Sequence, residues 1–209
     1  MKKITIISIL LLSFLTIFFL GACKNVASKN KSGKYDEVKV VSVLDGDTFF
    51  LDGRQKVHLI GIDAPVMPDE KTQRELVKQG KNLMEVRRQG RVARNFLKGL
   101  INKQKVKLQF DTQAKDKDGK TLLAYAYKLY CSKCKVNLEP EAMDIYKIEG
   151  DKVYLFINAF VVQWGYALPE SVPPNTKYDA LFLKLYQEAK ENERGLWKPQ
   201  KARRPWRKN

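Results

Sequence analysis

The stretch "VVSVLDGDTFFLDGRQKVHLIGIDAPV", residues 40–66, contains three apolar, β-branched runs separated by the turn dipeptides Asp45-Gly46 and Asp52-Gly53. Runs of this composition, joined by Asp-Gly turns, are typical of antiparallel strands. The sequence therefore predicts three successive strands, over residues 36–44, 48–51 and 56–62.

The same stretch places the carboxylates of Asp45, Asp47 and Asp63 next to the predicted strands. Aspartates commonly cap turns, and Asp45 is expected to do only that. Carboxylates on loops at strand ends are also the hard oxygen ligands that Ca²⁺ prefers. Residues 40–66 thus resemble half of a metal-dependent phosphodiesterase site.

The remainder of the chain mixes helices with further strands. Apolar residues at helical spacing predict an amphipathic helix over residues 92–101, with basic residues on its opposite face. Later elements are two strands at 105–110 and 122–130, a short helix at 159–164 capped by Asn158, and a helix at 176–194 stopped by Gly195. This order predicts an α+β fold, in which helices pack on a small antiparallel barrel.

The first segment, "MKKITIISILLLSFLTIFFLGAC", has the features of an export signal. Two lysines precede an apolar run over residues 4–20, and small residues precede Cys23. The ending resembles a bacterial lipobox, so residues 1–22 are expected to be a lipoprotein signal peptide and Cys23 to carry the lipid. The alternative is an uncleaved anchor helix. Both predict a protein held at the cell membrane with its domain outside the cytoplasm.

Residues 23–36 are polar and without periodicity, which indicates a flexible tether.

The formal net charge of the chain is +16, which favours nucleic acid or an anionic membrane as partner, although a solvated lysine-rich surface is the simpler alternative. The tail, residues 199–209, interleaves an aromatic side chain with cations, which suits nucleic-acid or membrane contact equally: Arg203, Arg204, Trp206 and Arg207.

Six pieces of sequence occur in the order that is characteristic of one family. They are "DGDT", "GIDAP", "QGRVARNFLKGLI" before "KVKLQFD", "DKDGKTLLAYAY", "INAFVVQWGYA" and "ERGLW". Together they resemble the staphylococcal nuclease (thermonuclease) family from about Val38 to Trp197. The resemblance implies a five-stranded OB-fold β-barrel packed by about three helices, here over residues 37–198.

The resemblance implies a Ca²⁺ site and a nuclease activity. Asp47 and Asp63 match the two carboxylate ligands of the family, and Ala64 matches the residue that offers a backbone carbonyl. Two arginines of the family grip the phosphate, and a glutamate positions or deprotonates the attacking water.

The phosphate and water positions depart from the family pattern. His58 stands where the family has its first arginine, and Lys120 or Thr121 matches the second. Neither a histidine nor a lysine offers the planar fork that binds phosphate bidentately. The glutamate position is Val66, although Glu70 or Asp69 could serve the water from a remodelled loop.

An insertion, residues 129–152, replaces a tight turn of the family and carries Cys131 and Cys134. This pair is half of a zinc site without a second half, so a short-range disulfide is expected outside the cytoplasm. The inserted hairpin is a candidate protein-binding element. The alternative is an extended surface loop without a binding role.

The sequence therefore predicts a membrane-anchored protein that acts on DNA or RNA through weak, metal-dependent phosphodiester hydrolysis. The alternative is a catalytically inert module that binds nucleic acid, another polyanion or a protein at the cell surface. Loss of a single electrostatic donor typically slows an enzyme by a hundredfold or more, which is why weak activity is expected.

Overall fold

The computed structural model describes residues 33–133 and 143–199. Five strands close into a barrel because β3 pairs with β2 on one side and, in parallel, with β6 on the other. These strands are β1 (Val38–Val43), β2 (Thr48–Leu51), β3 (Lys56–Leu59), β5 (Lys105–Gln109) and β6 (Thr121–Ser132). The remaining pairings of the barrel, β1 with β2, β1 with β5 and β5 with β6, are antiparallel.

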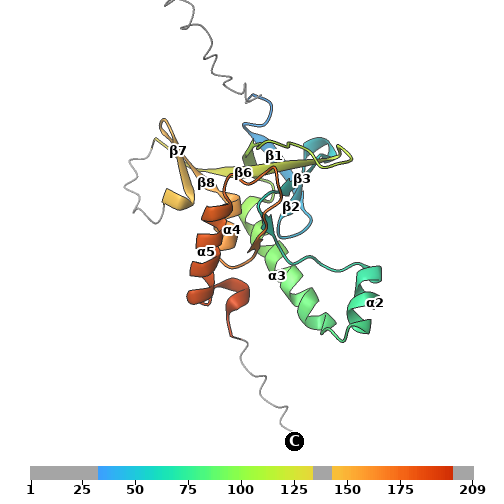
Figure 1. Cartoon of the computed structure of the whole chain (residues 1–209). Helices are drawn as coiled ribbons and strands as arrows, with labels where there is room; N and C mark the ends of the chain where they lie inside the picture. Colours follow the sequence, from blue (N-terminus) through green and yellow to red (C-terminus); the bar gives the residue numbers. More distant parts are fainter. Residues whose placement is uncertain (1–32, 134–142, 200–209) are drawn as a thin grey trace, which may run out of the picture. The chain divides into compact units, whose positions relative to one another are not determined.

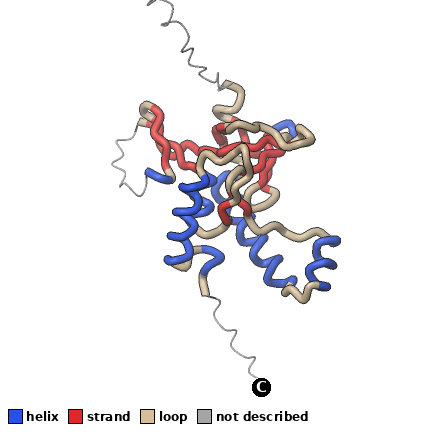
Figure 2. The backbone as a smooth tube through the Cα atoms, viewed as in Figure 1, coloured by secondary structure: helices blue, strands red, loops and turns tan. Residues whose placement is uncertain are grey.

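Within the described residues, four α-helices accompany the barrel, and Figures 1 and 2 show the strands gathered together with the helices extending to one side. They are α2 (Glu70–Lys78), α3 (Leu83–Ile101), α4 (Ile157–Gln163) and α5 (Asp179–Glu191). The core joins the inward sides of the barrel strands to α3, α4 and α5, through residues such as Val57, Leu97, Ile157 and Phe182. The α+β fold with a five-stranded, OB-like barrel is thus confirmed.

Two small additions complete the sheet structure. Strand β4 (Ile62–Asp63) pairs with β9 (Leu168–Pro169), and β7 (Tyr146–Glu149) forms a hairpin with β8 (Lys152–Phe156). Strand β8 also pairs with β6, so the described part of the predicted insertion extends the barrel sheet outward. A short 3₁₀ helix, η1 (Asp52–Arg54), joins β2 to β3, and a second, η3 (Gly195–Trp197), follows α5.

Several element boundaries differ from the prediction. Helix α3 begins at Leu83, nine residues before the predicted start, and Asn82 caps it by accepting a hydrogen bond from the Glu85 N–H. The strand predicted over 56–62 is broken after Leu59, where Gly61 adopts a positive φ of 81°. Helix α5 ends at Glu191, before Gly195. Helix α2 was not predicted, and it buries none of its residues.

The predicted capping role of Asn158 is wrong. Phe156 is the N-cap residue of α4, while the Asn158 side chain is fully buried. Its amide accepts a hydrogen bond from the Ala126 N–H at 3.0 Å and donates one to the Ile60 carbonyl at 2.9 Å. Asn158 therefore ties α4 to the barrel, which a local pattern of residues could not indicate.

None of the helices within the described ranges combines the length and the apolar character that crossing a membrane requires.

Candidate active site

Asp47 is the most enclosed carboxylate of the predicted site, with 3% of its surface exposed. It lies in the tight turn between β1 and β2, where the N–H groups of Leu44 and Asp45 both donate to the Thr48 carbonyl. Its Oδ2 accepts a hydrogen bond from the Ala64 N–H at 2.8 Å, and its Oδ1 accepts one from the Thr48 hydroxyl at 2.7 Å. The hydrogen bond from Ala64 joins the two acidic segments, which are the turn with Asp45 and Asp47 and the segment with Asp63 and Ala64.

Helix α3 holds both acidic segments by close packing of small residues. A methyl group added at Gly46 would lie 2.7 Å from Cβ of Ala64 and 2.8 Å from Cβ of Ala93. One added at Gly90 would lie 2.5 Å from the carbonyl oxygen of Val66. Contacts this short leave no space for larger side chains, so α3 fixes where both segments lie.

The aspartates of this region repel one another. Burial, and then the charge of Asp47, raise the pKa of Asp45 and of Asp63. Burial would also raise the pKa of Asp47, but hydrogen bonds from His58, Ala64 and Thr48 and the charge of His58 bring it below its ordinary value. Negative charge is thus concentrated in a partly buried place, and a cation bound there would relieve it.

His58 lies beside Asp47 on β3. Its Nδ1 is 3.1 Å from the Thr48 hydroxyl oxygen and 3.6 Å from Oδ1 of Asp47. Because the Thr48 hydroxyl donates to Asp47, it can only accept from Nδ1–H, which leaves Nε2 as the free nitrogen. Burial would lower the pKa of His58, but Asp47 and Glu170 more than compensate and raise it.

Lys56 and Glu170 are charged residues near this cluster that the sequence reasoning missed. The charge of Lys56 lowers the pKa of both Asp45 and His58, and Glu170 acts on His58. Lys56 is two residues before His58 on the same strand, so alternation along β3 could have indicated it. Glu170 follows β9, whose pairing with β4 brings it to Gly61, and no local signal announces that pairing.

The other predicted catalytic residues are on the surface. Lys120 lies in the turn before β6 with 83% of its side chain exposed, and its Nζ is 3.9 Å from Asp118. Glu70 begins α2 with 89% of its side chain exposed and pairs with Arg74 at 3.5 Å. Asp69 is the N-cap of α2 and accepts a hydrogen bond from the Thr72 N–H. The structure gives none of the three a contact with Asp47 or Asp63 among the described residues.

Several predicted sites lie outside the described residues, namely Cys23, Cys134, Arg203, Arg204, Trp206 and Arg207. Cys131 is near the end of β6, where the sheet extends into the insertion. The disulfide, the lipid anchor and the tail contacts therefore stay predictions.

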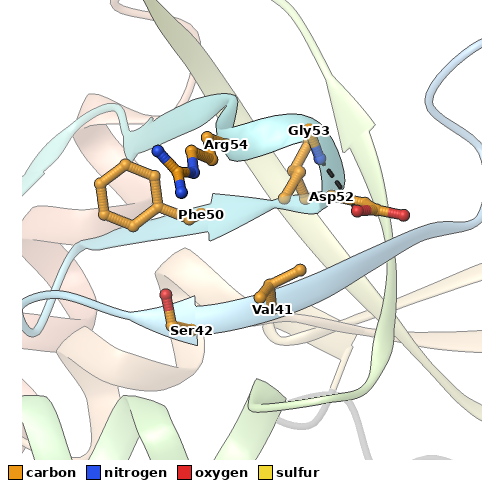
Figure 3. Close-up of a pocket in the computed structure, with 7 residues that line it drawn as sticks. Val41, Ser42, Phe50, Asp52, Gly53 and Arg54 are labelled. Atoms are coloured by element: carbon orange, nitrogen blue, oxygen red, sulfur yellow. Dashed lines mark hydrogen bonds between the residues drawn. The ribbon is translucent and has the colours of Figure 1, made fainter.

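The outer face of the barrel carries a separate hollow of about 360 Å³, formed by β1, β2 and η1. Figure 3 shows the Arg54 side chain extending beside the Phe50 ring, with Val41 and Ser42 on the neighbouring strand. None of the three aspartates of the predicted site lines this hollow.

The closed barrel, with its acidic segments packed on one helix, defines an OB-like α+β protein. The family model "Staphylococcal nuclease homologue" matches residues 56–199. Thermonuclease of Staphylococcus intermedius is 30% identical over 206 residues, covering 94% of this chain and 99% of the relative. Thermonuclease of Staphylococcus hyicus is 28% identical over 204 residues, with the same two coverages. An uncharacterized protein of Methanocaldococcus jannaschii is 26% identical over 215 residues, covering 90% of this chain and 93% of the relative.

The chain therefore belongs to the staphylococcal nuclease family. Within the residues that the structure describes, no three His, Cys, Asp or Glu side chains form a group that could by itself hold a metal ion.

Proposed function

We propose that the protein is a metal-dependent nuclease that hydrolyses phosphodiester bonds of nucleic acid, at a reduced rate because its catalytic set is incomplete. One observation carries this proposal: the Asp47 carboxylate accepts the N–H of Ala64, directly after Asp63, so both carboxylates at family metal positions lie in segments joined by a hydrogen bond. Family membership and the basic balance of the chain support nucleic acid as the substrate.

The donor set suits a hard divalent cation such as Ca²⁺. Asp47 and Asp63 supply carboxylate oxygens, Ala64 a backbone carbonyl, and the raised pKa values of Asp45 and Asp63 mark a place where positive charge is favoured. With fewer than three acidic or imidazole ligands grouped together in the described part of the chain, water or substrate would complete the coordination. A cation bound there supplies charge to the phosphate and acidifies a bound water.

The residues of the chain supply the rest of the chemistry unevenly. His58, held by Thr48, presents Nε2 for a proton or a phosphate oxygen, and Lys56 and Lys120 add charge near β3. Val66 stands where the family has its glutamate, and its apolar side chain can neither orient nor deprotonate water. Glu70, or Glu170 near His58, would have to serve the water from the surface.

The proposal includes the location and the partners. Residues 1–22 would direct export, a lipid on Cys23 would anchor the protein, and the domain would act outside the cytoplasm. A disulfide between Cys131 and Cys134 would close the insertion, and the tail with Arg203, Arg204, Trp206 and Arg207 would add nucleic-acid contacts. The inserted hairpin, residues 129–152, is proposed as a site for a protein partner.

A second candidate function is binding without cleavage. It is favoured by the exposed positions of Lys120 and Glu70, which place neither side chain against the acidic segments. A rigid catalytic site needs positions that are accurate to within about an ångström. If no surface group takes the place of the missing glutamate, the domain would hold nucleic acid without cutting it.

The test uses the full chain in neutral detergent with fluorescent single-stranded DNA and RNA, in Ca²⁺ or in chelator. Cleavage that requires Ca²⁺ and is lost in Asp47→Ala/Asp63→Ala would support the nuclease. The matched control is Asp52→Ala in the other Asp-Gly turn, whose carboxylate accepts a hydrogen bond from the adjacent Gly53 N–H and from no other described residue. Salt-sensitive binding with no cleavage would replace the nuclease by the binding module.

A further inference from the structure

Helix α3 carries four cations along one flank: Arg87, Arg91, Arg94 and Lys98. Their spacings of four, three and four residues place them as neighbours on one side of a helix, about 4.5 to 6 Å apart along its axis. The opposite flank carries Phe96, which stacks on Phe160 and Tyr166 of the α4 region. The four cations therefore form a stripe on the side of α3 that is turned away from α4.

One part of this stripe lies directly beside the acidic site. The Arg94 Nε donates to the Val43 carbonyl at 3.3 Å, at the end of β1 where the acidic turn begins. Since Gly90 and Ala93 pack against the two acidic segments, Arg91 and Arg94 are within one helical turn of those contacts.

The other end of the stripe reaches α2. Arg87 Nη2 donates to Oε1 of Gln73 at 2.5 Å, and α2 lies at the end of α3 that points away from the barrel (Figure 1). The stripe thus runs continuously from the acidic turn along the exposed part of α3. Helix α2 and the earlier start of α3 were not predicted from the sequence, so Arg87 and Arg91 had no place in the expected site.

The charge of the stripe is not neutralised within the described structure. None of Arg87, Arg91, Arg94 and Lys98 forms an ion pair with a described residue. By contrast, Arg88 on the same helix forms two hydrogen bonds to the Glu85 carboxylate, at 2.6 and 2.8 Å. Four unpaired cations in a row beside a site that is itself acidic point to a long anionic ligand.

We infer that the stripe of α3 binds the phosphate backbone of a nucleic-acid strand that enters the acidic site. This inference rests on the proposed function and adds to it a surface along which the substrate strand would lie. The arginine positions of the family match His58 and either Lys120 or Thr121 here, and α3 supplies guanidinium groups from a different element. Arginine is suited to this role because its planar fork matches phosphate oxygens bidentately.

An anionic membrane surface is the competing ligand, because Val77 and Met84 are exposed close to the stripe. A helix that lies on a bilayer needs its apolar face free to enter the interface. The apolar face of α3, with Ala93, Leu97 and Ile101, is fully buried against the barrel. This arrangement favours the nucleic-acid strand.

The test compares charge-matched double variants of the full chain in neutral detergent micelles. Arg87→Gln/Arg91→Gln removes two cations from the stripe, and Arg88→Gln/Lys39→Gln removes two exposed cations outside it. Affinity for a fluorescent single-stranded DNA is measured in chelator across a range of salt concentrations. For the stripe variant, the plot of the log association constant against the log salt concentration should become less steep by about 1.4. The affinity at 0.1 M salt should fall about 25-fold.

Arg87→Lys/Arg91→Lys keeps the charge and should retain most of the slope, which separates phosphate contact from damage to the helix. Equal losses in the stripe variant and its matched control would overturn the inference. It would also be overturned if the stripe variant kept its DNA affinity but lost a response to phosphatidylglycerol added to the micelles. Cleavage is followed in parallel samples that contain Ca²⁺ in place of chelator, so a parent that binds through the stripe without cutting refutes the nuclease alone.

Discussion

Two regions of the molecule hold carboxylates in opposite electrostatic settings. At the acidic site, Asp45 and Asp63 have raised pKa values because burial and the charge of Asp47 oppose their ionisation. On β7, burial would likewise raise the pKa of Glu149, but Lys107 and Lys147 bind its two oxygens at 2.5 and 2.8 Å and lower it. Lys56 and Arg94 lie near the acidic site, but their charges do not outweigh burial and repulsion at Asp45, whereas two lysines contact Glu149 directly.

The difference separates a carboxylate whose charge is balanced within the fold from carboxylates whose ionisation the fold opposes. Glu149 links β7 to β5, and its charge is balanced when the chain folds. The aspartates are held together by packing on α3, at a cost in folding stability that a bound cation would offset. Strain or repulsion retained at a site is a common sign of function.

The largest expected effect comes from adding a carboxylate to the acidic region. Val66 is 48% exposed, so Val66→Glu places the family glutamate at the edge of the site with little loss of packing. A positioned general base typically contributes about a hundredfold or more, and we expect cleavage in Ca²⁺ to rise by about a hundredfold. The measurement is the initial rate on single-stranded DNA.

The matched control for this gain is Val41→Glu, because Val41 is 49% exposed on the outer face of β1. It should leave the rate unchanged, and Val66→Glu/Asp47→Ala should cancel the gain. If Val66→Glu and Val41→Glu cleave at the same rate, the missing glutamate does not limit this enzyme.

The second prediction tests whether packing, rather than cations, holds the acidic segments. Gly90→Ala pushes a methyl group against the Val66 carbonyl at 2.5 Å, which should destabilise the fold by about 1 to 3 kcal/mol. Gly99→Ala, on the same helix, meets nothing within 4 Å and should stabilise the protein by about 0.5 to 1 kcal/mol. Urea unfolding measures both.

Opposite signs for these two alanines would confirm that α3 is pressed against the chain at Gly90 and has open space at Gly99. A destabilisation of similar size at Gly99 would show instead that α3 does not tolerate alanine in general, and the role given to Gly90 would be wrong.

The sequence predicted the barrel well because its strands are marked locally. The Asp-Gly turns and the β-branched runs fix β1, β2 and β3, and the short range from Asp45 to Asp63 contains both metal positions. Helix α2 escaped prediction because a helix that buries no residue carries no apolar stripe facing a core.

The rest of the site depends on contacts that are distant in the sequence. Glu170 comes near His58 only through the pairing of β9 with β4, more than a hundred residues apart. Asn158 looked like a helix cap because its two partners, Ala126 and Ile60, belong to other elements. Such pairings leave no periodic signal in a single sequence, whereas turns and strands do.

The smallest expected effect concerns the balanced carboxylate. The pKa of Glu149 is lowered from its ordinary value of 4.5, so its ion pairs stabilise the fold above pH 4.5, and this contribution is lost as the pH falls through the lowered value. Glu149→Gln should therefore cost about 0.5 to 1 kcal/mol at pH 7 and less at pH 3. Urea unfolding at the two pH values measures this difference.

Glu75→Gln on α2 is the matched control, since Glu75 is exposed and forms no ion pair with a described residue. Its effect should stay within a few tenths of a kcal/mol at both pH values. Equal costs of Glu149→Gln at pH 7 and pH 3 would mean that shape, and not charge, fastens β7 to β5. Glu149 could then no longer be contrasted with the aspartates of the acidic site as a carboxylate that is stabilised by charge, because its two lysines would have proved insufficient.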